Sequence, residues 1–148
     1  MAQNYKKQST FATKSKAEMK YLYHLITKYP LSCLLIVVIW YLCFFTPPET
    51  KLNKVDFIDK WTHIVMYLGT CTIIWIEYLK KHNKVEWTKA ITLAWLAPII
   101  MSGLIELLQA YCTNGRRSGE WLDLVANFIG VTLALVIGIL AARYHGKA

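Results

Sequence analysis

The sequence is poor in the residue patterns that build zinc knuckles and disulfide-rich domains. Its four cysteines are Cys33, Cys43, Cys71 and Cys112, and no two of them form a Cys-x-x-Cys pair. Each lies within or at the end of an apolar run, where a cysteine is usually a small buried side chain. No two histidines have the His-x-x-x-His spacing. We therefore predict no disulfide framework, no metal site and no cofactor.

Motifs for nucleophilic catalysis and phosphate binding are also missing. No glycine-rich phosphate loop is present, and neither Thr62 nor Ser118 stands in a recognisable nucleophile motif. Acidic residues are few, nine against 17 Lys and Arg, which gives a net charge of +8. The basic residues flank apolar runs and do not alternate with aromatic residues on a soluble face, so nucleic-acid binding is not expected.

Long apolar runs make up most of the chain, in which 55% of residues are hydrophobic and 14% aromatic. A helix rises about 1.5 Å per residue, so runs of about 20 residues can cross a hydrocarbon core about 30 Å thick. We predict an all-α fold, an integral membrane bundle of four transmembrane helices over about 29–45, 60–79, 87–111 and 121–142. These spans form one domain, 29–148, and follow a basic arm, 1–28, that is partly disordered or an amphipathic helix.

Prolines and small residues support these boundaries. Pro30 suits the first turn of a helix, and Pro47-Pro48 stops it. Within the third span, Pro98 removes a backbone donor and predicts a kink. The fourth span carries a stripe of small residues that predicts the close approach of a neighbouring helix: Gly130, Ala134 and Gly138.

The placement of basic residues predicts the orientation. Twelve of the 17 lie in the N-terminal arm, the 80–89 connection and the C-terminal tail, and five lie in the other two connections. Because Lys and Arg are retained on the cytoplasmic side, we predict a multi-pass protein of the bacterial cytoplasmic (inner) membrane with both termini cytoplasmic. The first span is read as an uncleaved anchor, since no small-x-small cleavage site follows it. Near a cytoplasmic end, Glu77 is expected to reach the interface or to pair with Lys80 or Lys81.

A first cluster of polar residues opens the second span. Asp59, His63 and Tyr67 are four residues apart and share one helix face. Asp59 is placed to orient the imidazole of His63, which leaves the other ring nitrogen for a ligand or for proton transfer. Lys60 beside them is a partner for carboxylates or for an anionic ligand.

A second cluster spans the turn between the third and fourth spans, and the orientation predicts that both clusters meet near the outer surface. Carboxylates are costly in a membrane, so several together need partners or a function. A structural alternative is that Glu106 and Arg117 form an ion pair that closes the bundle, with Gln109 and Asn127 as interhelical hydrogen-bonding groups. Solvated loop charges are expected at Lys51, Lys54, Asp56 and Glu120. The second cluster comprises Glu106, Gln109, Arg116, Arg117, Asp123 and Asn127.

Taken together, the two clusters resemble the VanZ-like family of small bacterial membrane proteins over about Val55 to Gly138. The resemblance is carried by Asp59-Lys60-x-x-His63-x-x-x-Tyr67, by Glu106-x-x-Gln109, and by Arg117 with Asp123, Asn127 and Gly130. The family is named for a protein that confers low-level resistance to the glycopeptide teicoplanin. The resemblance implies a functional set of Asp59, Lys60, His63, Tyr67, Glu106, Gln109, Arg117, Asp123 and Asn127. The doubled Arg116-Arg117 leaves open which arginine faces the site.

Three functions are compatible with this pattern. The first is an envelope protein whose pocket binds membrane lipid, in particular an anionic lipid head group or a cell-wall precursor. The second is an enzyme acting on such a lipid, with His63, Glu106 and Asp59 as acid–base groups. The third is a structural or partner-binding membrane subunit. The missing nucleophile and metal motifs favour the first over the second, and the sequence leaves the oligomeric state open.

Overall fold

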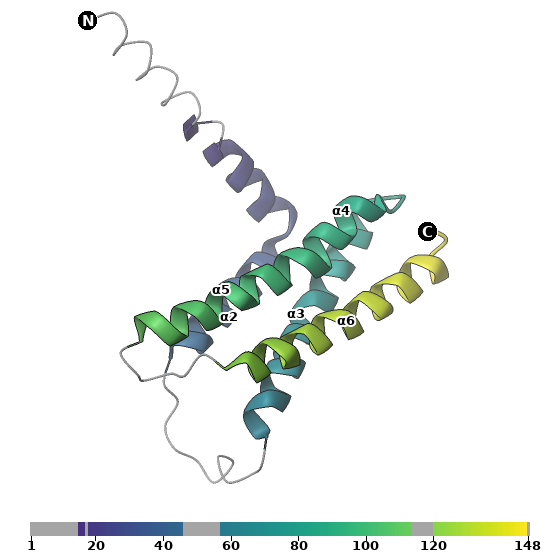
Figure 1. The fold of residues 1–148 in the computed structure, drawn as a ribbon. Coiled ribbons are helices and arrows are strands. Elements are labelled where there is room, and N and C mark those ends of the chain that lie inside the picture. Colours follow the sequence, from purple (N-terminus) through teal and green to yellow (C-terminus); the bar gives the residue numbers. More distant parts are fainter. Residues whose placement is uncertain (1–14, 17, 46–56, 114–119, 148) are drawn as a thin grey trace, which may run out of the picture. The chain divides into compact units, whose positions relative to one another are not determined.

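The computed structural model describes residues 15–16, 18–45, 57–113 and 120–147, and all regular elements within them are helices (Figure 1). The chain divides into two units, Met1–Pro30 and Leu31–Ala148. In the first unit, Glu18–Lys28 is helical. Its apolar residues recur at steps of three and four and are exposed, so this part of the arm is an amphipathic helix with an uncovered apolar stripe: Met19, Leu22, Tyr23 and Ile26.

The second unit contains the predicted spans as helices. They are α2 (Pro30–Phe44), α3 (Ile58–Lys81), α4 (Trp87–Ile91), a π-helical turn η2 (Thr92–Leu96), α5 (Ala97–Cys112) and α6 (Trp121–Tyr144). The pieces α4, η2 and α5 form one continuous helical stretch, Trp87–Cys112. The prediction of an all-α fold is therefore confirmed for the part of the chain that the structure describes.

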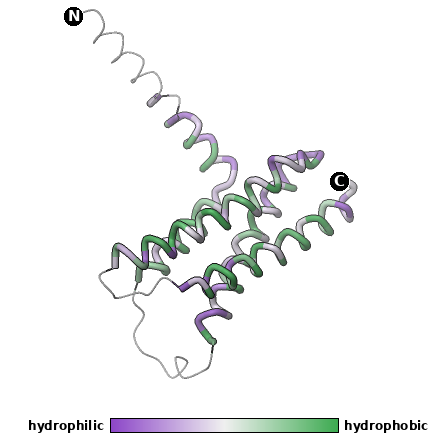
Figure 2. The backbone as a smooth tube through the Cα atoms, viewed as in Figure 1, coloured by the Kyte–Doolittle hydropathy of each residue, from purple (hydrophilic) through white to green (hydrophobic). Residues whose placement is uncertain are grey.

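Two of these helical stretches are long and apolar enough to cross a membrane, Trp87–Cys112 and Trp121–Tyr144. A third span is added if the helices Glu18–Lys28 and Pro30–Phe44 are counted as one. Figure 2 shows mostly hydrophobic residues along α5 and α6, many of them uncovered, as expected for helices in contact with lipid. The 24-residue α3 is not among these candidates, because the polar residues at its two ends and His63 lower its hydropathy.

The small-residue stripe of α6 lies against α3, and this is the most extensive helix pair in the described chain. A Cβ atom at Gly130 would stand 2.5 Å from the backbone oxygen of Ile64 on α3. A Cβ atom at Gly138 would overlap the indole ring of Trp75, which is almost fully buried. Glycine has no Cβ atom, so the two backbones approach closely at these positions. The predicted close approach of a neighbouring helix is confirmed.

We expect Gly130→Ala to destabilise the protein by about 1–3 kcal/mol, because the new methyl group meets backbone that cannot rotate away. The gain in helix propensity, about 1 kcal/mol, opposes this loss without cancelling it. At Gly69 on α3 a Cβ atom meets nothing within 4 Å, so Gly69→Ala is the matched control and should be neutral or stabilising. Thermal unfolding in detergent, followed by circular dichroism, measures both. A Gly130→Ala protein as stable as Gly69→Ala would contradict this account of the packing.

The irregularity predicted at Pro98 takes the form of a π-helical turn just before it. Pro98 has no N–H, so the regular hydrogen-bond ladder is broken one turn earlier. The N–H of Ala97 bonds to the carbonyl of Thr92, five residues back, which widens the helix across Thr92–Leu96. Within this turn, the indole nitrogen of Trp95 donates to the Thr132 hydroxyl of α6 over 3.3 Å.

Polar contacts at the two ends of α2 join this helix to α3 and α5. At its beginning, Glu77 of α3 accepts hydrogen bonds from the N–H of Leu31 at 3.1 Å, and from the N–H and hydroxyl of Ser32 at 2.9 and 2.5 Å. At its end, the Gln109 amide of α5 donates to the carbonyl of Cys43 over 2.7 Å. The expected pairing of Glu77 with Lys80 or Lys81 is thus replaced by a cap on α2, whose first N–H groups have no partner within the helix.

Candidate functional site

The beginnings of α3 and α6 meet the end of α5, and this brings the two predicted clusters together. Exposed aromatic residues mark the level of these helix ends: Trp61 on α3, Tyr111 on α5 and Trp121 on α6. Aromatic residues of this kind usually lie at the membrane–water interface. At about 1.5 Å of rise per residue, Asn127 lies about 9 Å below Trp121 along the helix axis. The polar cluster therefore extends from the level of these exposed aromatic residues into the apolar part of the bundle.

Lys60 is the centre of an ion-pair network that joins α3 to the start of α6. Its Nζ atom lies 2.5 Å from Oδ1 of Asp123, 2.6 Å from Oε2 of Glu120 and 3.6 Å from Oδ2 of Asp59. The Asp123 side chain is only 7% exposed and that of Lys60 18%, so this pair is shielded from water. Glu120, expected as a solvated loop charge, instead belongs to the network, and Lys60 is held by carboxylates of the chain itself.

A buried chain of hydrogen bonds links His63, Asn127 and Ser102, one residue from each of α3, α6 and α5. The amide nitrogen of Asn127 donates to the Ser102 hydroxyl over 2.7 Å. Its oxygen therefore faces Nδ1 of His63, at 3.0 Å, and accepts the proton carried there. Ser102 was missed by the sequence reasoning. Its spacing four residues before Glu106 and seven before Gln109, on one helix face, is the signal that could have found it.

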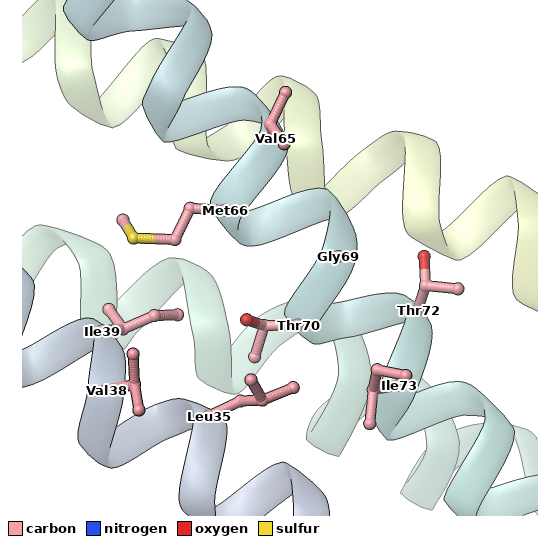
Figure 3. A pocket seen from close by; sticks show the side chains of 9 residues that line it. All are labelled: Leu35, Val38, Ile39, Val65, Met66, Gly69, Thr70, Thr72 and Ile73. Carbon is pink, nitrogen blue, oxygen red and sulfur yellow. The ribbon is translucent and has the colours of Figure 1, made fainter.

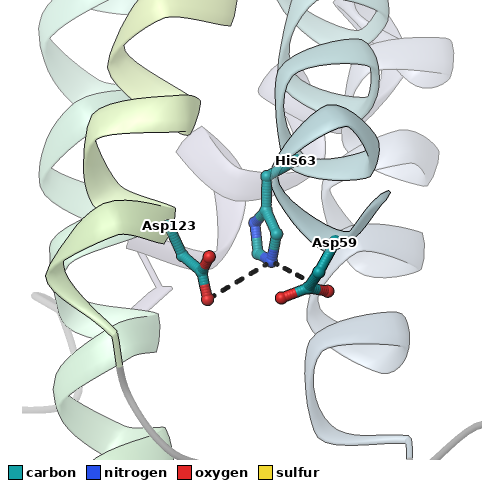
Figure 4. A group of neighbouring side chains, drawn as sticks. All are labelled: Asp59, His63 and Asp123. Carbon is teal, nitrogen blue, oxygen red and sulfur yellow. Dashed lines mark ion pairs between the residues drawn. The ribbon is translucent and has the colours of Figure 1, made fainter. Parts of the chain in front are cut away.

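The other ring nitrogen of His63 lies between two carboxylates, one from its own helix and one from α6 (Figure 4). Nε2 is 4.0 Å from Oδ1 of Asp59 and 3.8 Å from Oδ2 of Asp123. Both distances exceed the 2.7–3.2 Å or so of a hydrogen bond. Sequence analysis paired His63 with Asp59 alone; the structure adds Asp123 on the opposite side.

One further polar group of the cluster is buried without a hydrogen bond. It is Oε1 of Glu106, in a residue that is 7% exposed. The second oxygen of Glu106 accepts a long hydrogen bond, 3.3 Å, from the N–H of Glu120. The buried hydroxyl of Tyr67 lies beside Ser102. Buried polar groups in native proteins are nearly always paired, so the Glu106 carboxylate is a candidate for contact with a ligand.

The remaining members of the predicted site divide into two kinds. Gln109 is 4% exposed, and its amide donates to the Cys43 carbonyl, so the interhelical role considered for it is the one its contacts support. Arg116 and Arg117 lie outside the described residues. The expected contact of an arginine with a ligand and the alternative Glu106–Arg117 ion pair therefore stay predictions.

Between α2 and α3 lies an apolar groove of about 520 Å³. Glu77 of α3 binds the start of α2, and the groove opens between the two helices (Figure 3). It is lined from α2 by Leu35, Val38 and Ile39 and from α3 by Val65, Met66, Gly69, Thr70, Thr72 and Ile73. Along α3, the stripe of residues 59, 63, 66, 70 and 73 runs from the polar cluster directly into this groove.

Comparison of the chain with protein-family models, curated proteins and solved structures finds no match. The site combines a shielded ion-pair network, a buried hydrogen-bond chain, a buried Glu106 oxygen without a hydrogen bond and an adjoining apolar groove.

Proposed function

We propose that the chain is a VanZ-like integral membrane protein of the bacterial cell envelope that binds a membrane lipid, with the lipid tail in the groove between α2 and α3. The observation that carries this proposal is the continuity of groove and polar cluster along α3. Asp59 and His63 are followed on the same face by Met66 and Thr70, which line the groove. A lipid whose tail occupies the groove therefore has its head group beside Asp59 and His63.

The polar residues favour a head group rich in hydrogen-bond donors. Lys60 is already paired with Asp123 and Glu120, whereas Oε1 of Glu106 has no hydrogen bond. Carboxylates accept hydrogen bonds from hydroxyl and amide groups, which a lipid-linked cell-wall precursor offers through its sugar and peptide parts. We therefore favour such a precursor over a simple anionic phospholipid. Its phosphates would be held by Arg116 or Arg117, and its binding is the proposed link to glycopeptide (teicoplanin) resistance.

The proposal includes four spans, with the cluster on the outer side and both termini in the cytoplasm. The close packing of α3 against α6 supports α3 as a span, because His63 and Thr70 within it are buried against other helices and its exposed charged residues lie near its two ends. The buried Glu106 oxygen without a hydrogen bond argues against a purely structural subunit. In a bundle that ion pairs merely hold closed, a buried carboxylate oxygen without a hydrogen bond would only lower the stability.

We expect Gly69→Leu to abolish the co-purification of lipid without unfolding the protein. Gly69 lines the groove, and nothing lies within 4 Å of an added Cβ atom, so the leucine side chain enters space that the lipid tail would occupy. Displacing only two methylene groups costs about 1.6 kcal/mol, which is more than tenfold in affinity. Native mass spectrometry of the purified protein measures the bound lipid and gives its mass.

The matched control is Gly103→Leu on α5, away from the groove, where the nearest atom to an added Cβ is Cδ1 of Leu124 at 3.9 Å. This protein should keep its lipid. If Gly69→Leu retains as much lipid as Gly103→Leu, or if the wild-type protein carries no lipid, the proposed function is wrong. If the bound lipid is a phospholipid and not a cell-wall precursor, the proposed head group is wrong, but the proposed binding of the tail in the groove stands.

A further inference from the structure

Asp59, His63 and Asp123 offer three ligand atoms around one small space. These atoms, one carboxylate oxygen from each aspartate and one imidazole nitrogen, all lie within 4.8 Å of one another (Figure 4). Nε2 of His63 is 3.8 and 4.0 Å from the two oxygens. Ligands bound tetrahedrally at about 2.1 Å from a metal are about 3.4 Å apart. The two histidine–aspartate pairs are thus too far apart for hydrogen bonds and need to close by about half an ångström to reach metal-binding distances, while the two aspartate oxygens, within 4.8 Å of each other, move by up to about 1.4 Å.

The surrounding hydrogen bonds hold the imidazole in the form that binds a metal. Nδ1 of His63 carries the proton, because it faces the oxygen of Asn127, whose own nitrogen donates to Ser102. Nε2 is left with a lone pair that points between the two aspartates. A metal-binding histidine typically donates its other N–H in this way, which fixes the ring and its tautomer.

Lys60 orients the two carboxylates. In Asp123, Oδ1 pairs with Lys60 at 2.5 Å and Oδ2 faces His63. In Asp59, Oδ2 lies 3.6 Å from Lys60 and Oδ1 faces His63. Each aspartate thus turns one oxygen toward the lysine and the other toward Nε2, so the two free oxygens converge on the same space.

The cluster has more negative than positive charges, which favours the binding of a divalent cation. Glu106, from α5, is 7% exposed, has one oxygen without a hydrogen bond, and interacts electrostatically with Asp123, Asp59 and Lys60. Within the described residues, Lys60 is the cation of this network, and it pairs with Asp59, Glu120 and Asp123. Uncompensated negative charge is costly in a membrane protein. The three carboxylates paired with Lys60 exceed its single positive charge by two, which one divalent ion would balance.

We propose that Asp59, His63 and Asp123 bind one divalent transition-metal ion, which the sequence patterns did not predict. Two carboxylate oxygens and one imidazole nitrogen suit Zn²⁺ or Mn²⁺ better than Mg²⁺ or Ca²⁺, which prefer oxygen ligands alone. Three protein ligands leave at least one coordination position open to water or to a ligand oxygen. Glu106 stands beside the ion as a further acidic group. The site is independent of whether a lipid occupies the groove.

The test is titration of purified, EDTA-stripped and dialysed protein with ZnCl₂ and, separately, MnCl₂, followed by isothermal titration calorimetry. We expect uptake of about one ion per chain by the wild-type protein and a loss of affinity of at least about 100-fold in His63→Gln and Asp59→Asn. The Asp59 side chain is 52% exposed, so Asp59→Asn keeps the fold and decides the result if His63→Gln does not fold. His145→Ala, which changes an exposed histidine near the C-terminus, is the control for adventitious binding.

Two results would overturn the metal site: no uptake of either metal by the wild-type protein, or uptake that Asp59→Asn and His63→Gln leave unchanged while His145→Ala reduces it. The titration contains no added lipid, and the lipid measurement on Gly69→Leu needs no metal. Failure of the metal site is therefore distinguishable from failure of the proposed lipid binding.

Discussion

Lys60→Met should destabilise the protein by about 3–5 kcal/mol, the usual cost of removing one partner from a shielded ion pair. The change leaves Asp123, which is almost fully buried, without its cation at 2.5 Å. It also removes the contact with Glu120 that joins the start of α6 to α3. Equilibrium unfolding in mixed micelles with EDTA present, followed by circular dichroism, measures the loss without compensation by bound metal.

An exposed ion pair of similar length in the same chain provides the control. Nζ of Lys89 lies 2.6 Å from Glu86, with side chains that are 67% and 56% exposed, and Lys89→Met should have little effect on stability because water solvates both charges. Adding Asp123→Leu to Lys60→Met should restore part of the stability, because the buried carboxylate that lies 2.5 Å from Lys60 is then removed as well. If Lys60→Met costs no more than Lys89→Met, the network is solvated and the site is not shielded as described.

Asn127→Leu should have the second-largest effect, because it breaks the hydrogen-bond chain across three helices. The N–H at Nδ1 of His63 and the hydroxyl of Ser102 both lose a partner in a buried place, at about 1–3 kcal/mol for each group left unsatisfied. With the imidazole no longer held, the affinity for Zn²⁺ should fall by about 10–100-fold. Unfolding in detergent measures the loss of stability, and metal titration of the same preparation measures the loss of Zn²⁺ affinity.

Thr132→Val is the matched control on the same helix. It removes the hydrogen bond from Trp95, which is long at 3.3 Å and only partly buried, so the cost should stay near 1 kcal/mol and Zn²⁺ binding should not change. An Asn127→Leu protein that loses no more stability than Thr132→Val and binds Zn²⁺ normally would show that the chain does not position His63.

The helices could be predicted from the sequence because apolar runs, prolines and small residues act locally. Pro30 lies at the start of α2, and the stripe from Gly130 to Gly138 lies where α6 meets α3. A kink was predicted at Pro98, and the structure has a widened turn over Thr92–Leu96 before it, which was not predicted because it depends on how the freed carbonyls find partners.

The site was harder to predict because its partners are far apart in sequence. The same-face spacing of Asp59 and His63 was visible, whereas the approach of Asp123 from α6 depends on how closely the glycines let that helix pack. Ser102 was overlooked and Glu120 was predicted only as a solvated loop charge for the same reason: a lone serine in an apolar run and a glutamate beside a turn acquire their contacts only from α6 and α3.

The hydrogen bonds at the two ends of α2 affect the order in which the helices pack during synthesis. The carboxylate that caps the start of α2 belongs to Glu77, which is synthesised 45 residues after Ser32. The amide that binds its last turn belongs to Gln109, which leaves the ribosome 66 residues after Cys43. Both contacts can therefore form only after Glu77 and Gln109 have been synthesised, so α2 reaches its final packing only once α5 has been made.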